Sequence, residues 1–147
     1  MKKENLIKSA KALSVPGQKA ASEYLSKHSV LVAGVNKILS DREDLLQLIG
    51  EGNVGMMLDN HNNHALFLES LFTKYEPEVL VETVTWVFSA YRNHGFHDTY
   101  WAAQLNAWLK VLEAELTKES FTEIKPFYDW LIINIPAFAT LCKTSNS

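Results

Sequence analysis

Histidine is the residue type in this sequence with the clearest capacity for chemistry, and four of its five copies fall in two similar pentapeptides. These are NHNNH at residues 60–64 and NHGFH at residues 93–97. A three-residue spacing can bring two imidazoles to one side of a helix. Four neutral imidazoles would suit zinc, copper, nickel or iron, whereas the Glu-x-x-His pattern of di-iron sites does not occur. The commoner role of an inward-facing imidazole, a hydrogen-bonded core residue, is the alternative for each of them.

The segment 53–72 is predicted to be the helix that positions the first pair. Asn53 follows the breaker run Gly50-Glu51-Gly52 and suits an N-cap. Helical spacing creates an apolar stripe about 100° wide, made of Val54, Met57, Leu58, His61, Ala65, Leu68 and Phe72. His61 lies inside this stripe and His64 lies at its edge. Each imidazole must therefore find a hydrogen-bond partner, bind a metal or cofactor, or stay neutral at some cost.

Helical spacing also predominates in the segments before this helix. Residues 3–13 are predicted to form a short peripheral helix, within an arm of residues 1–14. A longer helix over 18–35 places His28 on an apolar face. Ser40 and Glu43 match a capping box for a short helix that ends at Gly50.

The segments after residue 72 follow the same pattern. Pro77 and the flanking glutamates favour a helix that runs to His94, where Gly95 offers a C-terminal cap. Asp98 suits the N-cap of the next helix, and the last helical segment is kinked or divided at its two prolines, Pro126 and Pro136. No strand is predicted. The expected fold is therefore an all-α domain of six to seven helices, globin-like or an irregular bundle.

Length and composition favour a single globular domain over residues 1–142, with a disordered tail at 143–147. The chain has 147 residues, of which 47% are hydrophobic. Residues 1–40 hold seven lysines against two glutamates, a charge of +5, so the remainder carries −8 of the total of −3. These lysines are spread along helix faces without interleaved aromatic residues. Nucleic-acid binding is therefore not favoured.

Several function classes lack their usual signals. Cys142 is the only cysteine, which excludes an internal disulfide and favours a cytoplasmic protein. No apolar run approaches the ~20 residues of a membrane span, and no signal peptide is predicted. The GxSxG, HExxH, Walker and GxGxxG motifs are absent. Catalysis is therefore less favoured than binding, although His97, Asp98 and Tyr100 could supply acid–base groups.

An inward histidine on one long helix, followed by another near the end of the next, resembles the globin superfamily. The resemblance concerns helix order over residues 18–142. It implies that His94 is the iron ligand of a haem and that His61 or His64 faces the distal side. Trp101, Trp108, Phe127 and Tyr128 would complete the pocket. Globins keep a phenylalanine on the haem before the distal helix, whereas residues 36–52 contain no aromatic residue.

The sequence therefore predicts a small cytoplasmic binding or sensing module. The resemblance implies a tetrapyrrole such as haem as the ligand, held by His61, His64 and His94, with His94 on the metal. The alternative is a cofactor-free domain for protein–protein interaction or regulation, with a protein partner or a second copy of the chain. In that alternative His94, directly before Gly95, caps the negative end of its own helix.

Overall fold

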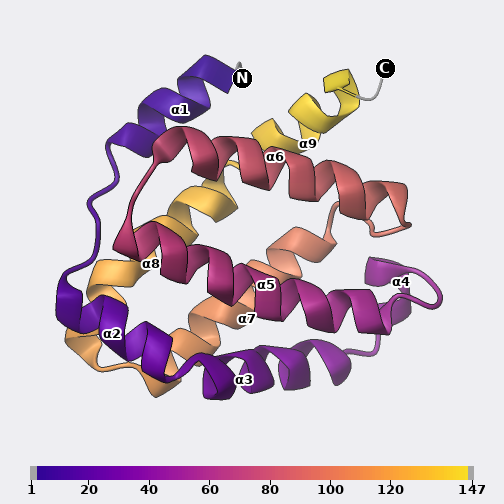
Figure 1. Cartoon of the computed structure of the whole chain (residues 1–147). Coiled ribbons are helices and arrows are strands. Elements are labelled where there is room, and N and C mark those ends of the chain that lie inside the picture. Colours follow the sequence, from indigo (N-terminus) through magenta and orange to yellow (C-terminus); the bar gives the residue numbers. More distant parts are fainter. Residues whose placement is uncertain (1–2, 146–147) are drawn as a thin grey trace.

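Helices make up most of the structure, a computed structural model that describes residues 3–145 (Figure 1). This part of the chain contains nine helices and no strand. The single all-α domain that the sequence predicts is confirmed, but the number of helices exceeds the predicted six to seven. The helices are α1 (Lys3–Lys11), α2 (Gln18–Ser26), α3 (His28–Ser40), α4 (Leu45–Ile49), α5 (Val54–Thr73), α6 (Pro77–Asn93), α7 (Tyr100–Glu115), α8 (Lys118–Ile133) and α9 (Ile135–Ser145).

One extra helix arises because the predicted helix over 18–35 is broken at Lys27. The backbone of Lys27 has φ −99° and ψ 11°, outside regular helical values, and separates α2 from α3. Both helices contact α5, but their other main partners differ, since α2 packs against α8 while α3 packs against α7. The break at Lys27 therefore lets α2 and α3 reach these different partners. The spacing of apolar residues over 18–35 does not predict it.

The predicted start of the short helix is wrong. Ser40 is the last residue of α3 rather than an N-cap, and α4 begins at Leu45 after Asp44. The Ser40–Glu43 pattern matched a capping box by spacing alone, while α3 continues through Ser40 because its buried face extends to Leu39.

The last helical segment divides at Asn134, two residues before Pro136. Pro136 is one of the two prolines at which the sequence predicts a kink or a division. Pro136 is the second residue of α9, a position where the missing backbone N–H has no helical partner to lose. Pro126 lies inside α8, which continues through it. α9 extends to Ser145, so residues 143–145 of the predicted tail are helical. Residues 146–147 of that tail lie outside the described part of the chain.

The helices form two groups (Figure 1). α6 packs against α1 and α9, and Figure 1 shows these three helices along one side of the molecule, where both termini also lie. The second group joins α3 to α5 and α7, and α8 to α7 and α2. The pair α5 and α6 is not among the closely packed pairs, although the two helices are consecutive.

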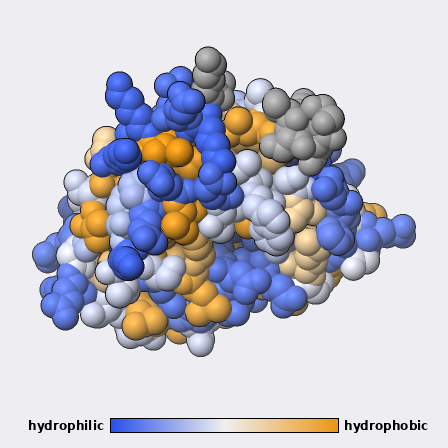
Figure 2. Space-filling view, turned by 45° about the horizontal axis from the view of Figure 1, so that its top comes forward, coloured by the Kyte–Doolittle hydropathy of each residue, from blue (hydrophilic) through white to orange (hydrophobic). Residues whose placement is uncertain are grey.

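The surface mixes polar and apolar residues. In Figure 2, hydrophobic residues on the viewed face lie among hydrophilic ones. Within residues 3–145, none of the helices is both long enough and apolar enough to span a bilayer. The core contains many aromatic pairs, such as the edge-to-face pair of Tyr24 and Phe72 with ring centroids 5.2 Å apart.

Candidate ligand-binding cavity between α5 and α6

The buried stripe of α5 differs in position from the predicted one. Five of its seven predicted members are buried, namely Met57, His61, Ala65, Leu68 and Phe72. Val54 and Leu58 are 49% and 37% exposed, so their predicted inward position is wrong. Asn60 and Leu71 are buried in addition. The buried face of α5 is therefore shifted, relative to the predicted stripe, towards Asn60 and His64. His61 and His64 both face the interior.

His61 connects α5 to α3 and α7. Its Nδ1 lies 2.6 Å from Asn36 Oδ1, and its Nε2 lies 3.1 Å from the hydroxyl oxygen of Tyr100. The Tyr100 hydroxyl donates to Asn60 Oδ1 at 2.7 Å. Burial lowers the pKa of His61 to about 4. The imidazole is therefore neutral near pH 7, and it is held as a hydrogen-bonded core residue.

His64 belongs to a second buried chain of hydrogen bonds. Its Nε2 lies 2.9 Å from the Tyr128 hydroxyl, which lies 2.7 Å from the Tyr24 hydroxyl. Burial, with a smaller contribution from His61, lowers the pKa of His64 to about 3. If Tyr24 donates to Tyr128 and Tyr128 donates to His64, every hydroxyl hydrogen has an acceptor. This order leaves the hydrogen of the neutral imidazole on Nδ1.

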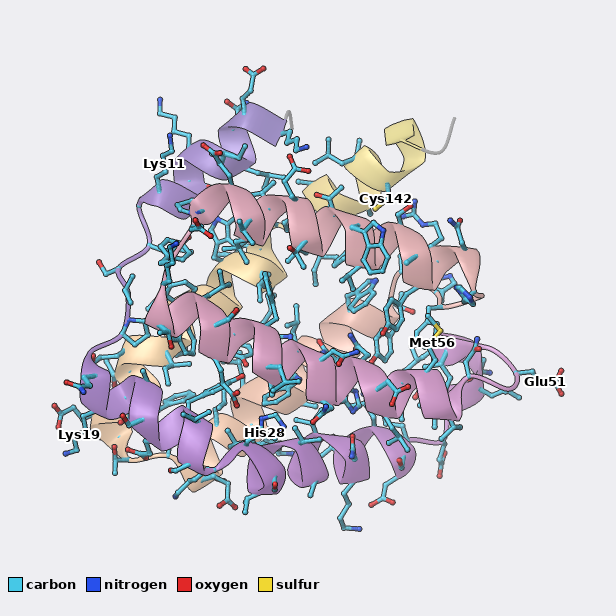
Figure 3. All side chains as sticks on the ribbon, in the orientation of Figure 1. Lys11, Lys19, His28, Glu51, Met56 and Cys142 are labelled. Atoms are coloured by element: carbon cyan, nitrogen blue, oxygen red, sulfur yellow. The ribbon has the colours of Figure 1, made fainter. Side chains whose placement is uncertain are left out.

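His28 is in the opposite electrostatic situation. It is the first residue of α3, and its side chain faces α5 (Figure 3). Its Nδ1 lies 2.6 Å from Glu69 Oε1, and its Nε2 lies 2.8 Å from Asn62 Oδ1. Both neighbours accept hydrogen bonds, which favours the ring with two N–H groups. The hydrogen bonds to Asn62 and then Glu69 raise the pKa of His28 above its ordinary value.

The second histidine pentapeptide lies at the surface. His94 is exposed at the C-terminal end of α6, and its Nδ1 lies 2.9 Å from the Ala90 carbonyl oxygen. His97 is also exposed and pairs with Thr99 through Nδ1 at 2.8 Å. Among the described residues, no group of three or more His, Cys, Asp or Glu side chains is arranged to hold a metal ion. The two pentapeptides therefore do not form one four-histidine site.

A cavity of about 290 Å³ separates α5 from α6. Side chains of α7 and α8 complete its wall. Most lining side chains are apolar and none is charged. They are Asn60, Asn63, His64, Phe67, Leu68, Leu80, Thr83, Val84, Trp86, Val87, Phe88, Tyr91, Trp101, Gln104, Leu105 and Leu131. Of the three predicted ligand-binding histidines, His64 lines this cavity, whereas His61 and His94 do not.

Two buried polar atoms close to this cavity have no hydrogen-bond partner among the described residues. One is Oε1 of the lining residue Gln104, whose side chain is 1% exposed. The other is Nε1 of Trp108, one turn farther along α7. The Trp108 ring lies against the imidazole of His64, with ring centroids 4.7 Å apart. Unpaired buried groups are costly, so this face of α7 has unused hydrogen-bonding capacity.

The sequence alone did not identify Asn60 or Gln104 as site residues. Asn60 stands in an asparagine-rich run, and its neighbours Asn62 and Asn63 are exposed as the helical spacing predicts. Gln104 stands between the core positions Trp101 and Leu105, where its burial could have been inferred from the helical face. Leu105 and Leu131, which the apolar stripes predict to be core, are both buried.

Comparisons of this chain with known protein families, curated proteins and solved structures found no match. The class defined here is therefore that of the fold alone, a single all-α domain of nine helices within residues 3–145. The function has to be argued from the cavity, because a fold class by itself does not establish one.

Proposed function

We propose that this protein binds a small, uncharged and largely apolar molecule in the cavity between α5 and α6. The observation that carries the proposal is a cavity of about 290 Å³ whose lining has no charged side chain. An apolar cavity of ~150 Å³ holds one benzene molecule in another protein. A molecule with one or two rings therefore matches this volume.

The electrostatic character of the lining favours an uncharged ligand. His64 is the only lining side chain that titrates in the acidic range, and its pKa of about 3 keeps it neutral near pH 7. An ionic ligand would lose its hydration on entering the cavity and would find no opposite charge on the wall. The aromatic walls, such as Phe88 stacked on Trp101 at 4.5 Å, suit a flat apolar molecule.

The lining does not fit a haem held by His94. His94 lies outside the cavity, the Nε2 of His64 is occupied by Tyr128, and no lining side chain carries a positive charge for the propionates. A macrocycle of four pyrroles is also far larger than one or two rings. The proposed binding function therefore does not include iron.

Toluene and benzoate form a matched pair of probes for the proposed function. Toluene should shift the indole N–H resonances of Trp86 and Trp101 saturably in NMR spectra, whereas benzoate should not bind because its carboxylate stays hydrated. Val84→Phe should fill the cavity and abolish toluene binding. Val79→Phe, on the exposed side of the same helix, is the control and should leave binding unchanged.

Two results would contradict this proposal. One is a titration of the parent protein in which toluene causes no saturable change. The other is toluene binding that survives Val84→Phe. Haem added to the same protein tests the globin resemblance separately, since a defined Soret band that disappears in His94→Ala would show axial ligation by His94. We expect no such band.

Protein–protein interaction is a second candidate, because Trp86 at the cavity wall is 66% exposed on α6. Large aromatic side chains are enriched at interfaces, and an exposed tryptophan is unusual on a surface that contacts only water. Sedimentation velocity over a range of protein concentrations tests self-association through this residue. Association that Trp86→Ser abolishes would support the second candidate, and a monomer at all concentrations would argue against self-association.

A further inference from the structure

The lining of the cavity between α5 and α6 has a buried part and an open part. In the buried part, Leu80, Phe88 and Leu105 are at most 4% exposed. In the open part, Trp86 on α6 is 66% exposed, and Asn63 on α5 is exposed as well. The cavity therefore reaches the surface where these two side chains lie, and we call this end its mouth.

The polar groups in the buried part are mostly engaged or enclosed. Asn60 Oδ1 accepts a hydrogen bond from the Tyr100 hydroxyl at 2.7 Å, and His64 Nε2 lies 2.9 Å from the Tyr128 hydroxyl oxygen. Gln104 Oε1 has no partner among the described residues, but it is almost without accessible surface, so a ligand in the cavity does not reach it. A ligand group in this part therefore meets mainly apolar side chains, where an unpaired polar group is costly.

The amide of Asn63, at the mouth, is free of protein partners. Its side chain makes no hydrogen bond within residues 3–145, and neither does the indole N–H of Trp86. The next residue, Asn62, is also exposed, but its Oδ1 is held by His28 at 2.8 Å. Since no protein atom fixes the Asn63 amide, its two N–H donors and its oxygen can turn towards a polar group of a ligand at the mouth.

We propose that the ligand is a neutral aromatic alcohol, whose ring occupies the buried part of the cavity and whose hydroxyl group lies at the mouth, hydrogen-bonded to Asn63. This inference rests on the proposed binding function and specifies the chemical class and the orientation of the ligand. A hydroxyl group both donates and accepts, so it matches an amide, and it is uncharged, as the uncharged lining requires. Ligand pockets commonly combine apolar walls with a few polar groups that fix orientation.

The same arrangement determines which related molecules bind less well. A hydrocarbon of the same shape fills the cavity but makes no hydrogen bond to Asn63. A molecule with a second hydroxyl group at the far end of its ring buries that group among mainly apolar side chains, at a cost in affinity. The position of the hydroxyl group on the ligand is therefore as important as its presence.

The test compares three probes of similar shape by NMR titration, with the indole N–H resonance of Trp101 as the signal. The probes are 2-phenylethanol, propylbenzene, in which a methyl group replaces the hydroxyl, and 2-(4-hydroxyphenyl)ethanol, which adds a hydroxyl at the far end of the ring. The proteins are the parent, Asn63→Leu, which has a similar size and no amide, and Asn106→Leu as the control. Asn106 is likewise exposed on a helix, but it does not line the cavity.

We expect the ratio of the dissociation constant of propylbenzene to that of 2-phenylethanol to fall by about fivefold in Asn63→Leu, the effect of one ordinary hydrogen bond. Asn106→Leu should leave this ratio unchanged. An unchanged ratio in Asn63→Leu, or a parent protein that binds propylbenzene but not 2-phenylethanol, would overturn the inference while leaving the binding function intact.

The parent protein alone tests the orientation. 2-Phenylethanol should bind more tightly than 2-(4-hydroxyphenyl)ethanol. Its ring protons should show intermolecular nuclear Overhauser effects to the methyl groups of Leu105, and the protons next to its hydroxyl should show them to Asn63. Equal or reversed affinities, or the opposite orientation, would contradict the inference. If neither propylbenzene nor 2-phenylethanol binds the parent, the proposed function fails as well.

Discussion

The two sides of α5 differ in how their polar groups are used. Towards α3, His28 is held by Glu69 and Asn62, and His61 is held by Asn36, so polar side chains join the helices. Towards α6, the backbones do not pack closely and a cavity of about 290 Å³ remains. We refer to these as the closed side and the open side of α5.

The difference shows that hydrogen-bonding capacity, more than apolar content, separates a structural interface from a candidate site. On the closed side, both ring nitrogens of His28 lie within hydrogen-bond distance of an acceptor on α5, and Nδ1 of His61 donates to Asn36 Oδ1. On the open side, Gln104 Oε1 has none. Folding favours satisfied buried polar groups, so the unpaired one marks the open side as less completely packed than the closed side.

Removing core volume should have the largest effect and should differ between the two sides. Leu31→Ala in α3 should cost about 4–5 kcal/mol of unfolding free energy, near the upper end of the range for a well-packed leucine, because Leu31 is fully buried. Leu105→Ala should cost about 2–3 kcal/mol, since its side chain borders the cavity and has fewer contacts to lose. Urea denaturation of both variants measures these values. A larger loss for Leu105→Ala would contradict the distinction between the sides.

Acid should destabilise the protein through His61. Its pKa is about 4 in the folded state, below the value of about 6.5 expected in the unfolded chain, so the unfolded state binds the proton first. Stability is therefore retained above about pH 6.5 and lost as the pH falls towards 4. The loss should amount to about 3 kcal/mol, at about 1.4 kcal/mol for each pKa unit.

The variant His61→Gln should have a flatter dependence of unfolding free energy on pH in this window, because its side chain does not titrate. Urea denaturation at several pH values measures the slope. His28→Gln is the matched control, since the pKa of His28 is raised and its titration lies at higher pH. Equal slopes for the parent protein and His61→Gln would disprove the role assigned to His61.

Tyr128→Phe should have an intermediate effect. The Tyr128 hydroxyl lies between Tyr24 and His64, so its removal leaves two buried polar groups without their partner. The expected cost is about 1–3 kcal/mol. Tyr75→Phe is the control, because Tyr75 is only half-buried and its hydroxyl makes one hydrogen bond, to the Ala10 carbonyl. Thermal denaturation should show a smaller loss for the control, and equal losses would argue against a shared buried network.

Glu69→Gln should have the smallest effect and the opposite pH dependence. The raised pKa of His28 means that the folded state binds its proton more tightly than the unfolded chain does. This stabilisation is complete below about pH 6.5 and disappears as the pH rises through the folded pKa of His28. The variant should therefore lose about 1 kcal/mol at about pH 5.5 and much less at about pH 9. A loss that grows with pH would contradict this assignment.

The sequence determined the fold class and most helix positions. Apolar residues recur at three- and four-residue spacing along almost the whole chain, and this period is compatible only with helices. Asn53 precedes α5 and Pro77 opens α6, as predicted, because a proline at the first helical position acts through the local backbone. The Asn53 side chain, however, makes no capping hydrogen bond to α5 and donates instead to the carbonyl oxygens of Ile49 and His94. The inward position of His61 followed from the same local periodicity.

The tertiary structure alone decided where chemistry can occur. The sequence was compatible with a site shared by His61, His64 and His94. In the structure the end of α6 lies apart from these residues of α5, and only His64 lines the cavity. The break at Lys27 and the burial of Gln104 depend on which helices meet, and these contacts join residues far apart in the chain. Local periodicity gives the inner face of each helix. It does not say which neighbour covers that face, whether the two surfaces close completely, or which buried polar group is left without a partner.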